Sequence, residues 1–326
     1  MPVTLVQAQQ NAQTDLDVSV IDEFRTNQIM DLLTFDDAVN PAGGGATLTY
    51  GYRRLITAGA AGFRAINAEY TPGEVATQQY TVNLTPLGGS FQVDRVLARV
   101  GPAASAAVSL NMSQKIKATQ AKFGDAVING DSSAEANSFD GLSKALAGTA
   151  TEDTAVHDWS GAMTQALAFQ IMEDVDDLLT LLDGTDATAL LGNRKTINKI
   201  KSAARWTSQY VTTPGPRDTT IDRYGPAQLI DAGYTAGEAA NVVKINATDP
   251  DSTGPLVAGS TSLYAVRFGL DGFHGVTTVG SPLVQTWLPD FTRAGAVKTG
   301  EVEMGPVAVA LKATKAAAVL RNVKVQ

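Results

Sequence analysis

The feature that most constrains the fold is a long amphipathic helix predicted over residues 103–129. Gly101 and Pro102 begin it. Proline suits the first helical turn, because an N–H there has no hydrogen-bond partner within the helix. Positions on one helical stripe then recur at spacings of four and three residues: Val108, Met112, Ile116, Thr119, Phe123 and Val127. At 1.5 Å per residue the helix spans roughly 40 Å, longer than an average helix of a globular protein.

This helix stops abruptly at Asn129 and Gly130, a natural left-handed cap. The following residues 131–138 are small and polar, and the sequence then recovers Phe-Asp-Gly-Leu at 139–142. The stretch has no cysteine or histidine, and its acids have no recognisable catalytic spacing. We therefore interpret it as a connector that turns the chain between two packed units.

Two stretches before the helix resemble arms. Residues 1–40 are polar with scattered apolar positions that predict a short helix on an extended arm, ended by Pro41 and the glycines that follow: Val20, Ile21, Phe24, Ile29, Leu32 and Leu33. Residues 46–100 have the Thr, Tyr and Val content of strands. Because the arms, residues 1–45 and about 50–85, have little apolar content, we expect neither to fold against its own domain.

The second arm is predicted to be a hairpin whose tip is "EYTPGE", since a type II turn favours Pro72 and Gly73 at its two central positions. Its charged residues are candidates for a phosphate-binding patch or for salt bridges between subunits. The residues predicted to contact a neighbouring subunit are Arg53, Arg54, Arg64, Glu69, Tyr70, Pro72, Gly73 and Glu74.

The sequence after the connector predicts a compact α/β unit. Ser160 is expected to cap a second long helix that Gly184 ends, with an acidic, solvated face formed by Glu173, Asp174, Asp176 and Asp177. "ATALLGN" predicts a buried strand, "RKTINKIKSAAR" a helix, and "YGPAQLIDAG" and "SLYAVRFGLDGFHGV" later strands. From Leu283 onward the chain is strand-like again.

Composition excludes several classes of site. The chain has 326 residues, 44% of them hydrophobic, a net charge of −8 and no cysteine, so thiolate chemistry and disulfides are excluded and a basic nucleic-acid-reading surface is disfavoured. Of the two histidines, we expect His274 to be a turn or packing residue, and neither lies in a recognisable catalytic motif. We predict no catalytic residues, no cofactor and no metal site.

The order of these elements resembles the major capsid proteins of tailed bacteriophages, the HK97-like fold. Four phrases carry the resemblance at their positions along the chain: "FQVDRVL", "NGDSSAEANSFDGL", "SLYAVRFGLDGFHGV" and "KAAAVLRNVKV". The resemblance implies an α+β fold with an N-terminal arm (1–45), an E-loop hairpin with flanking strands (46–90), a peripheral domain with a spine helix (91–150), an α/β axial domain (151–282) and a C-terminal return to the peripheral domain (283–326).

The resemblance also implies a function. The chain is expected to be a structural protein, not an enzyme, that self-assembles into the hexamers and pentamers of an icosahedral capsid around a double-stranded DNA phage genome. Expected partners are other copies of itself, a scaffolding protein and a portal, with a decoration protein as a further candidate, while DNA is contacted without sequence preference and no membrane is involved. The expected location is the virion, assembled in the cytoplasm of a bacterial host.

Two alternatives remain open at this point. An encapsulin-like nanocompartment has the same fold but holds cargo peptides, and an unrelated α/β enzyme is disfavoured by the missing catalytic motifs. Electron micrographs of the purified protein distinguish shells from an enzyme, and the packaged contents distinguish the two kinds of shell.

Overall fold

The structure is a computed structural model that describes most of the chain. Described residues are 29–40, 47–57, 59, 61–70, 73–96, 102–184 (102–107 by backbone alone), 186–215, 220–235, 237, 240–245, 257–280 and 282–326. The helices are α2 (Ile29–Leu32), α3 (Pro102–Asn129), α4 (Leu142–Leu146), α5 (Gln165–Thr180), α6 (Arg194–Trp206) and the 3₁₀ turn η5 (Thr314–Ala316). None of the helices in the described part of the chain has the length and apolar content that crossing a membrane requires.

Three sheets organise the strands. The first has the order β1 (Phe35–Val39), β12 (Phe273–Thr278), β14 (Val297–Leu311), β13 (Val284–Trp287), with β4 (Thr85–Asp94) also paired to β14. The second has the order β5 (Glu152–Asp153), β15 (Ala317–Lys324), β11 (Ser260–Val266), β7 (Ala189–Gly192), β10 (Ala227–Asp231), β9 (Thr220–Tyr224), β8 (Val211–Pro214), with β6 (His157–Asp158) also on β15. The third contains only β2 (Thr49–Thr57) and β3 (Ala76–Asn83).

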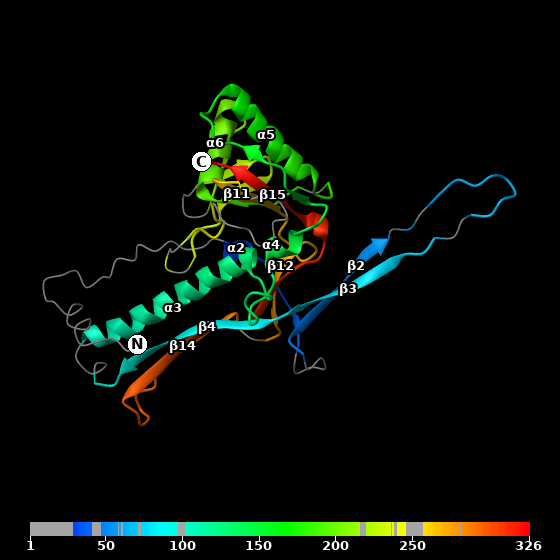
Figure 1. Ribbon diagram of the computed structural model, residues 1–326. Helices are drawn as coiled ribbons and strands as arrows, with labels where there is room; N and C mark the ends of the chain where they lie inside the picture. Colours follow the sequence, from blue (N-terminus) through cyan, green and yellow to red (C-terminus); the bar gives the residue numbers. More distant parts are fainter. Residues whose placement is uncertain are drawn as a thin grey trace.

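The long helix is confirmed as α3, and its stripe packs as predicted. Met112 at the near end of the stripe lies in a small apolar cluster with Phe91 of β4 and Val302 of β14. Phe123 and Val127 at the far end are fully buried in the main core. Figure 1 shows α3 lying along β4 and β14, and we call this helix and the first sheet the peripheral unit.

The connector after α3 is a loop that closes on itself. The N–H of Gly141 donates to the carbonyl of Gly130 at 2.8 Å, so the two ends of the loop meet. A Cβ atom on Gly130 would lie 2.4 Å from the carbonyl oxygens of Ala126 and Phe139, which explains glycine there. Lys144 bonds to Asp131 and lies 3.1 Å from Asp140. The predicted connection between the two units therefore begins with a turn that these bonds close, and the turn leads directly into α4.

The second sheet forms the middle layer of an axial unit, in which α5 and α6 cover one face. Successive residues of a strand point to opposite faces, and Leu263 and Ala265 of β11 accordingly join the core under the two helices. The neighbouring Tyr264 and Val266 join the core shared with the peripheral unit. Side chains of this sheet alternate between two apolar cores, so the sheet separates the two. This explains why the sequence predicts its strands as buried.

The start of the second long helix differs from the prediction. The N-cap is Thr164, whose hydroxyl accepts from the N–H of Leu167 at 3.3 Å, and α5 begins at Gln165. Ser160 instead donates its hydroxyl hydrogen to Asp158 at 2.6 Å. Both residues are good caps, and the apolar stripe alone does not decide between two candidates one turn apart.

Part of the predicted N-terminal arm packs against its own subunit. Residues 1–28 and 41–46 lie outside the described residues, but Ile29 is fully buried and Leu33 and Val39 are nearly so. β1 pairs in parallel with β12, from Phe35 opposite Gly275 to Val39 opposite Thr278. For residues 29–40 the expectation that the arm cannot fold against its own domain is therefore wrong, because their large apolar side chains pack in or against the main core.

A buried ion pair ties α4 to the second sheet. Arg321 of β15 is 1% exposed, and its Nε lies 2.6 Å from Oε1 of Glu152, whose side chain is 3% exposed. The same guanidinium donates to the hydroxyl of Ser143 at 2.9 Å and to the Ser143 carbonyl at 3.0 Å. Three segments, residues 142–146, 152–153 and 317–324, are thus joined at one cation.

We predict that Arg321→Ala destabilises the subunit by about 3–5 kcal/mol, because it leaves Glu152 charged and buried without its partner. Chemical denaturation of the unassembled subunit measures this loss. The double variant Arg321→Met with Glu152→Leu is expected to recover most of the stability, since it removes both charges. A loss below about 1 kcal/mol for Arg321→Ala would contradict the assignment.

A histidine in the axial unit is held by two carboxylates. Nδ1 of His157 lies 3.0 Å from Asp174 Oδ1, and Nε2 lies 3.4 Å from Asp153 Oδ2. The indole N–H of Trp159 donates to the other oxygen of Asp174 at 2.6 Å. The hydrogen bond to Asp174 is the largest of the effects that raise the pKa of His157 above its usual value.

This raised pKa gives stability a defined dependence on pH. A protonated His157 stabilises the folded axial unit fully below the unfolded pKa of about 6.5, and this contribution is lost as the pH rises through the higher folded pKa. Relative to His157→Gln, the wild-type subunit is thus expected to lose thermal stability between pH 6 and about 8. Parallel melting curves for the two proteins across this range would refute the prediction.

Candidate functional site

The hairpin of β2 and β3, with the loop between them, stands apart from the rest of the subunit, and we call it the hairpin arm. Its strands pair antiparallel from Thr49 opposite Asn83 to Thr57 opposite Ala76, and they form a sheet of their own. Figure 1 shows the arm projecting far beyond both units. A two-stranded hairpin is marginally stable alone in water, so the arm depends on contacts at its base or with another molecule.

The turn of the arm lies earlier than "EYTPGE". The N–H of Ala68 donates to the carbonyl of Ala65 at 3.1 Å, and Asn67 between them has a φ of 68°. The register that sets Thr57 opposite Ala76 also places the middle of the loop here. Residues 71 and 72 of the predicted tip lie outside the described residues. Asn67 was not singled out because an Asn before Ala is a weaker turn signal than Pro-Gly.

Arg54 fixes the base of the arm to its own subunit. Its Nε donates to the carbonyl of Lys312 at 2.8 Å, and its Nη2 donates to the Leu311 carbonyl and to the hydroxyl of Tyr52. The guanidinium lies 4.4 Å from the ring centroid of Tyr80, and the Tyr52 and Tyr80 rings are stacked at 5.8 Å. Burial raises the pKa of Tyr52. We call Arg54, Tyr52 and Tyr80, together with the carbonyls of Leu311 and Lys312, the arm clamp.

The arm clamp supplies Arg54 with partners inside its own chain. Arg54 was predicted to find its partners in another subunit, but its hydrogen bonds go to backbone carbonyls more than 250 residues away in the same chain. Arginine carries five N–H donors, and a further contact between Arg54 and another subunit stays a prediction. Sequence reasoning placed Arg54 on the arm correctly and could not locate acceptors so distant along the chain.

The other predicted contact residues lie along the arm without converging on a site. Arg53, Glu69, Gly73 and Glu74 are exposed, and Pro72 lies outside the described residues. Arg64 donates to the carbonyls of Ala65 at 3.3 Å and Ala68 at 3.2 Å, and its guanidinium lies 5.3 Å from the ring centroid of Tyr70. Arg64 and Tyr70 therefore shape the turn, and a contact between any of these residues and another subunit stays a prediction.

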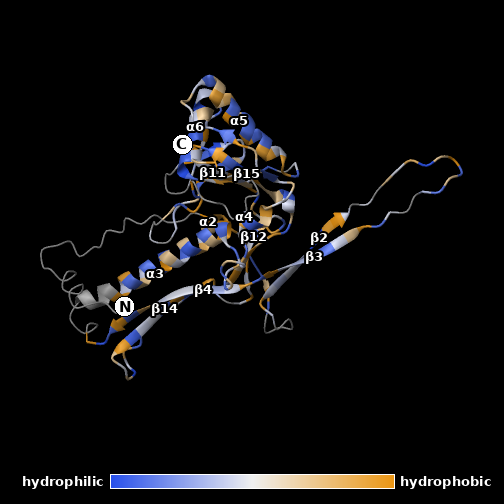
Figure 2. Ribbon diagram, viewed as in Figure 1, coloured by the Kyte–Doolittle hydropathy of each residue, from blue (hydrophilic) through white to orange (hydrophobic). Residues whose placement is uncertain are grey.

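The residues that sequence reasoning missed are apolar. Phe63 is 109% exposed relative to its reference and Ile66 is 92% exposed. Other large apolar side chains of the arm are also exposed: Leu55, Ile56 and Val75, together with Tyr70, which the sequence prediction includes. Figure 2 shows hydrophobic residues at the end of β2 and at the far end of the arm. The low overall apolar content of the stretch concealed them, although an exposed apolar group of this kind is a signature of an interaction surface.

The described residues offer little for chemistry. No group of three or more His, Asp and Glu side chains suited to a metal is found among them. His274 is buried in β12 with its ring edge-on to Tyr50 at 5.9 Å, and burial lowers its pKa. This confirms the packing role predicted for His274.

Comparison of the whole chain with solved structures identifies its fold. The SrpI encapsulin of Synechococcus elongatus is 17% identical with a TM-score of 0.60, and the match covers 99% of this chain and 97% of that one. The capsid protein of the empty GTA particle is 14% identical, covering 98% of each chain with a TM-score of 0.61. The capsid of the Myoviridae phage XM1 is 11% identical, covering 96% of this chain and 98% of that one with a TM-score of 0.57.

The chain has the HK97-like fold. The match extends over nearly the full length of both chains in each comparison, so it includes the arm as well as the two units. The α+β fold and the resemblance stated from the sequence are thereby confirmed. No protein-family model and no curated protein matches the sequence.

We predict that Arg54→Ala frees the base of the HK97-like hairpin arm while the body of the subunit keeps its stability. Losing charged hydrogen bonds worth about 1–3 kcal/mol raises the exchange rates of β2 and β3 amides by about tenfold to a hundredfold. Hydrogen exchange read by mass spectrometry measures this. Arg53→Ala, the neighbouring exposed arginine, is the matched control and is expected to change nothing. Equal exchange in both variants would contradict the role of the arm clamp.

Proposed function

We propose that this chain is the major capsid protein of a tailed bacteriophage, with a structural rather than a catalytic role. It assembles through hexamers and pentamers into an icosahedral shell around a double-stranded DNA genome. The observation that carries the proposal is a projecting arm with a fully exposed apolar end, Phe63 and Ile66, on a fold shared with capsid and encapsulin shells. Such side chains are costly in a lone subunit and favourable once a neighbour covers them.

The energetics favour assembly through many weak contacts. Burial of a large apolar side chain is worth about 1.5–3 kcal/mol, which is too little to hold two subunits together against the entropy of association. Repeated at every subunit of a closed shell, the same contact becomes strong through multivalency. Arm contacts thus build a shell without making stable dimers.

The proposal includes partners and a location. A scaffolding protein and a portal are the expected partners in assembly, a decoration protein is a further candidate, and the virion is the expected location of the mature protein. The net charge of −8 favours weak contact with DNA, independent of sequence, because like charges repel.

A nanocompartment shell is the second candidate, favoured by the match to an encapsulin at 17% identity over 99% of the chain. An encapsulin-like role predicts protein cargo inside the shell, whereas the phage role predicts double-stranded DNA. Nuclease-protected DNA in shells isolated from a producing host supports the phage capsid. Protected protein cargo without DNA supports the alternative.

We predict that Phe63→Ser with Ile66→Ser abolishes shells or makes them fragile. Both side chains are exposed in the subunit, so unfolding is expected to change by less than about 0.5 kcal/mol. Electron microscopy with scaffold supplied measures shell yield, and thermal unfolding measures subunit stability. The matched control is Val156→Ser, which alters an exposed apolar residue of the axial unit. Normal shells from the double variant, or an unfolded subunit, would contradict the role of the arm.

A further inference from the structure

A second surface with the properties of an interface lies on α6. The helix carries five basic residues and no acid, in a chain of net charge −8: Arg194, Lys195, Lys199, Lys201 and Arg205. Its apolar side, including Ile197 and Ile200, is buried against the sheet. Two of the basic residues already have partners, since Lys201 pairs with Asp222 and Arg205 lies over the ring of Tyr210 at 4.9 Å. The charge that remains is concentrated near the start of the helix.

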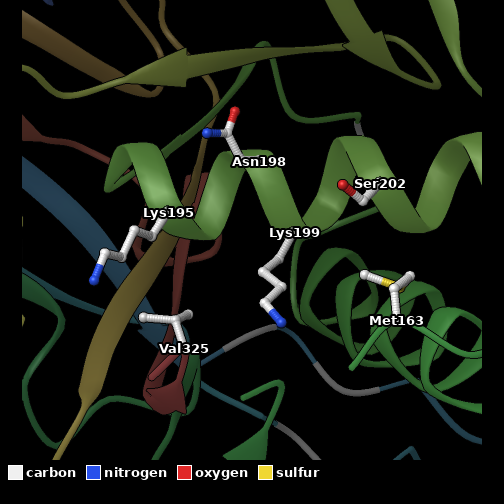
Figure 3. Close-up of a pocket in the computed structure, with 6 residues that line it drawn as sticks. All are labelled: Met163, Lys195, Asn198, Lys199, Ser202 and Val325. Carbon is white, nitrogen blue, oxygen red and sulfur yellow. The ribbon is translucent and has the colours of Figure 1, made fainter. Parts of the chain in front are cut away.

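A hollow of about 370 Å³ opens at this place. It is lined by Met163, Lys195, Asn198, Lys199, Ser202 and Val325, and Figure 3 shows both lysines reaching from α6 toward the side where Met163 and Val325 lie. Lys199 donates to the carbonyl of Gly161 at 2.9 Å and Lys195 donates to the side chain of Gln326. Both acceptors are neutral, and neither lysine pairs with a carboxylate of the described residues.

The neighbouring helix α5 carries a complementary row. Phe169, Glu173 and Asp177 are four residues apart and therefore lie on one face, and all three are exposed, Phe169 by 55%. The other two acids of the run are engaged, because Asp174 bonds to His157 and Trp159, and Asp176 accepts from Tyr224 at 2.6 Å. The solvated face predicted from the sequence therefore holds two structural carboxylates and two others, Glu173 and Asp177, for which no ion pair is found among the described residues.

The two helices pack against each other on one face of the second sheet. α5 packs over β15 and α6 over β10, and two further strands separate β15 from β10 in the sheet. In Figure 1, α6 lies beside the chain end at the left of the axial unit and α5 slopes down its right side. Two different patches that complement each other pair head to tail between copies, which generates rings when the rotation closes.

We propose that the hollow on α6 receives Phe169 of a second copy of this chain, with Lys195 and Lys199 pairing with Glu173 and Asp177 of that copy. The inference rests on the proposed shell function and names a contact within its rings. Met163 and Val325 supply apolar lining for the phenyl group, while the lysines gain carboxylates in addition to the neutral oxygens that they contact among the described residues. Such charge pairs select the partner and its register more than they add affinity.

Charge reversal tests the pairing directly. The basic-face variant is Lys195→Glu with Lys199→Glu, and the acidic-face variant is Glu173→Lys with Asp177→Lys. Each alone places like charges against each other and is expected to weaken ring formation by about tenfold or more. The matched control, Lys244→Glu with Lys315→Glu, makes the same charge change at exposed lysines elsewhere and is expected to form rings as the wild type does.

Rescue distinguishes pairing from a general charge effect. The variant with all four substitutions restores complementary charges and is expected to form rings alone. An equal mixture of the basic-face and acidic-face variants is expected to form rings in which the two alternate. Alternation requires an even number of members, so six-membered rings recover and five-membered rings do not. Native mass spectrometry or negative-stain microscopy counts the members. Phe169→Ser is expected to weaken rings even at high salt, where the charge effect is screened.

The outcomes separate the inference from the function. Wild-type protein that forms neither rings nor shells with scaffold supplied would overturn the proposed function. Wild-type shells together with normal rings from both the basic-face and the acidic-face variant would overturn only this contact. A third outcome also overturns it: the basic-face variant assembles normally but loses binding to double-stranded DNA, which would assign the lysines to phosphate.

Discussion

The structure depends on one continuous stretch, residues 297–324, which belongs to both large sheets. Its first part, β14, pairs with β4, β12 and β13, and its last part, β15, pairs with β11, β5 and β6. Only the short turn η5 separates the two parts. Because strand pairing fixes both ends of this stretch, the peripheral and axial units are held by backbone hydrogen bonds rather than by a linker.

Several features of the subunit follow from this constraint. The carbonyls that accept from Arg54 belong to Leu311 and Lys312, where the chain leaves β14. Arg321 of β15 gathers α4 and β5 around one buried cation. The arm, α4 and the axial sheet are thus all anchored to the same segment. In the proposed shell, the arm is therefore presented in a defined direction before a neighbour binds, which reduces the entropy that association must overcome.

Local patterns in the sequence predicted the elements but not the contacts between them. The stripe from Val108 to Val127 and the run of apolar residues at β7 are short-range signals, and both elements were found where expected. The interactions of Arg321 with Glu152 and of Arg54 with Lys312 join residues 169 and 258 positions apart. No periodicity reports such pairs, because their partners are chosen by the tertiary fold.

The sequence located the candidate functional surface only in part. The reason is the same: local patterns do not report which side chains the tertiary fold leaves uncovered. The arm was located from its strand-like composition, yet the prediction selected its charged residues with Tyr70, Pro72 and Gly73, and passed over Phe63 and Ile66. Apolar residues in a polar stretch resemble ordinary surface scatter until the structure shows that nothing in the described subunit covers them. Likewise, the acids of α5 form a solvated run in the sequence, and only the fold separates Asp174 and Asp176, which have partners, from Glu173 and Asp177.

In the proposed shell of identical acidic subunits, charge and apolar area contribute differently to assembly. Each copy carries a net charge of −8, so copies repel at a distance and nonspecific association is suppressed. At contact range within about a Debye length, roughly 8 Å at physiological ionic strength, local pairs outweigh this repulsion only where opposite charges meet. A basic helix beside an acidic one therefore allows close approach in one register and penalises the others. Apolar side chains such as Phe63 and Phe169 add affinity once that register is reached, because burial is favourable without being directional.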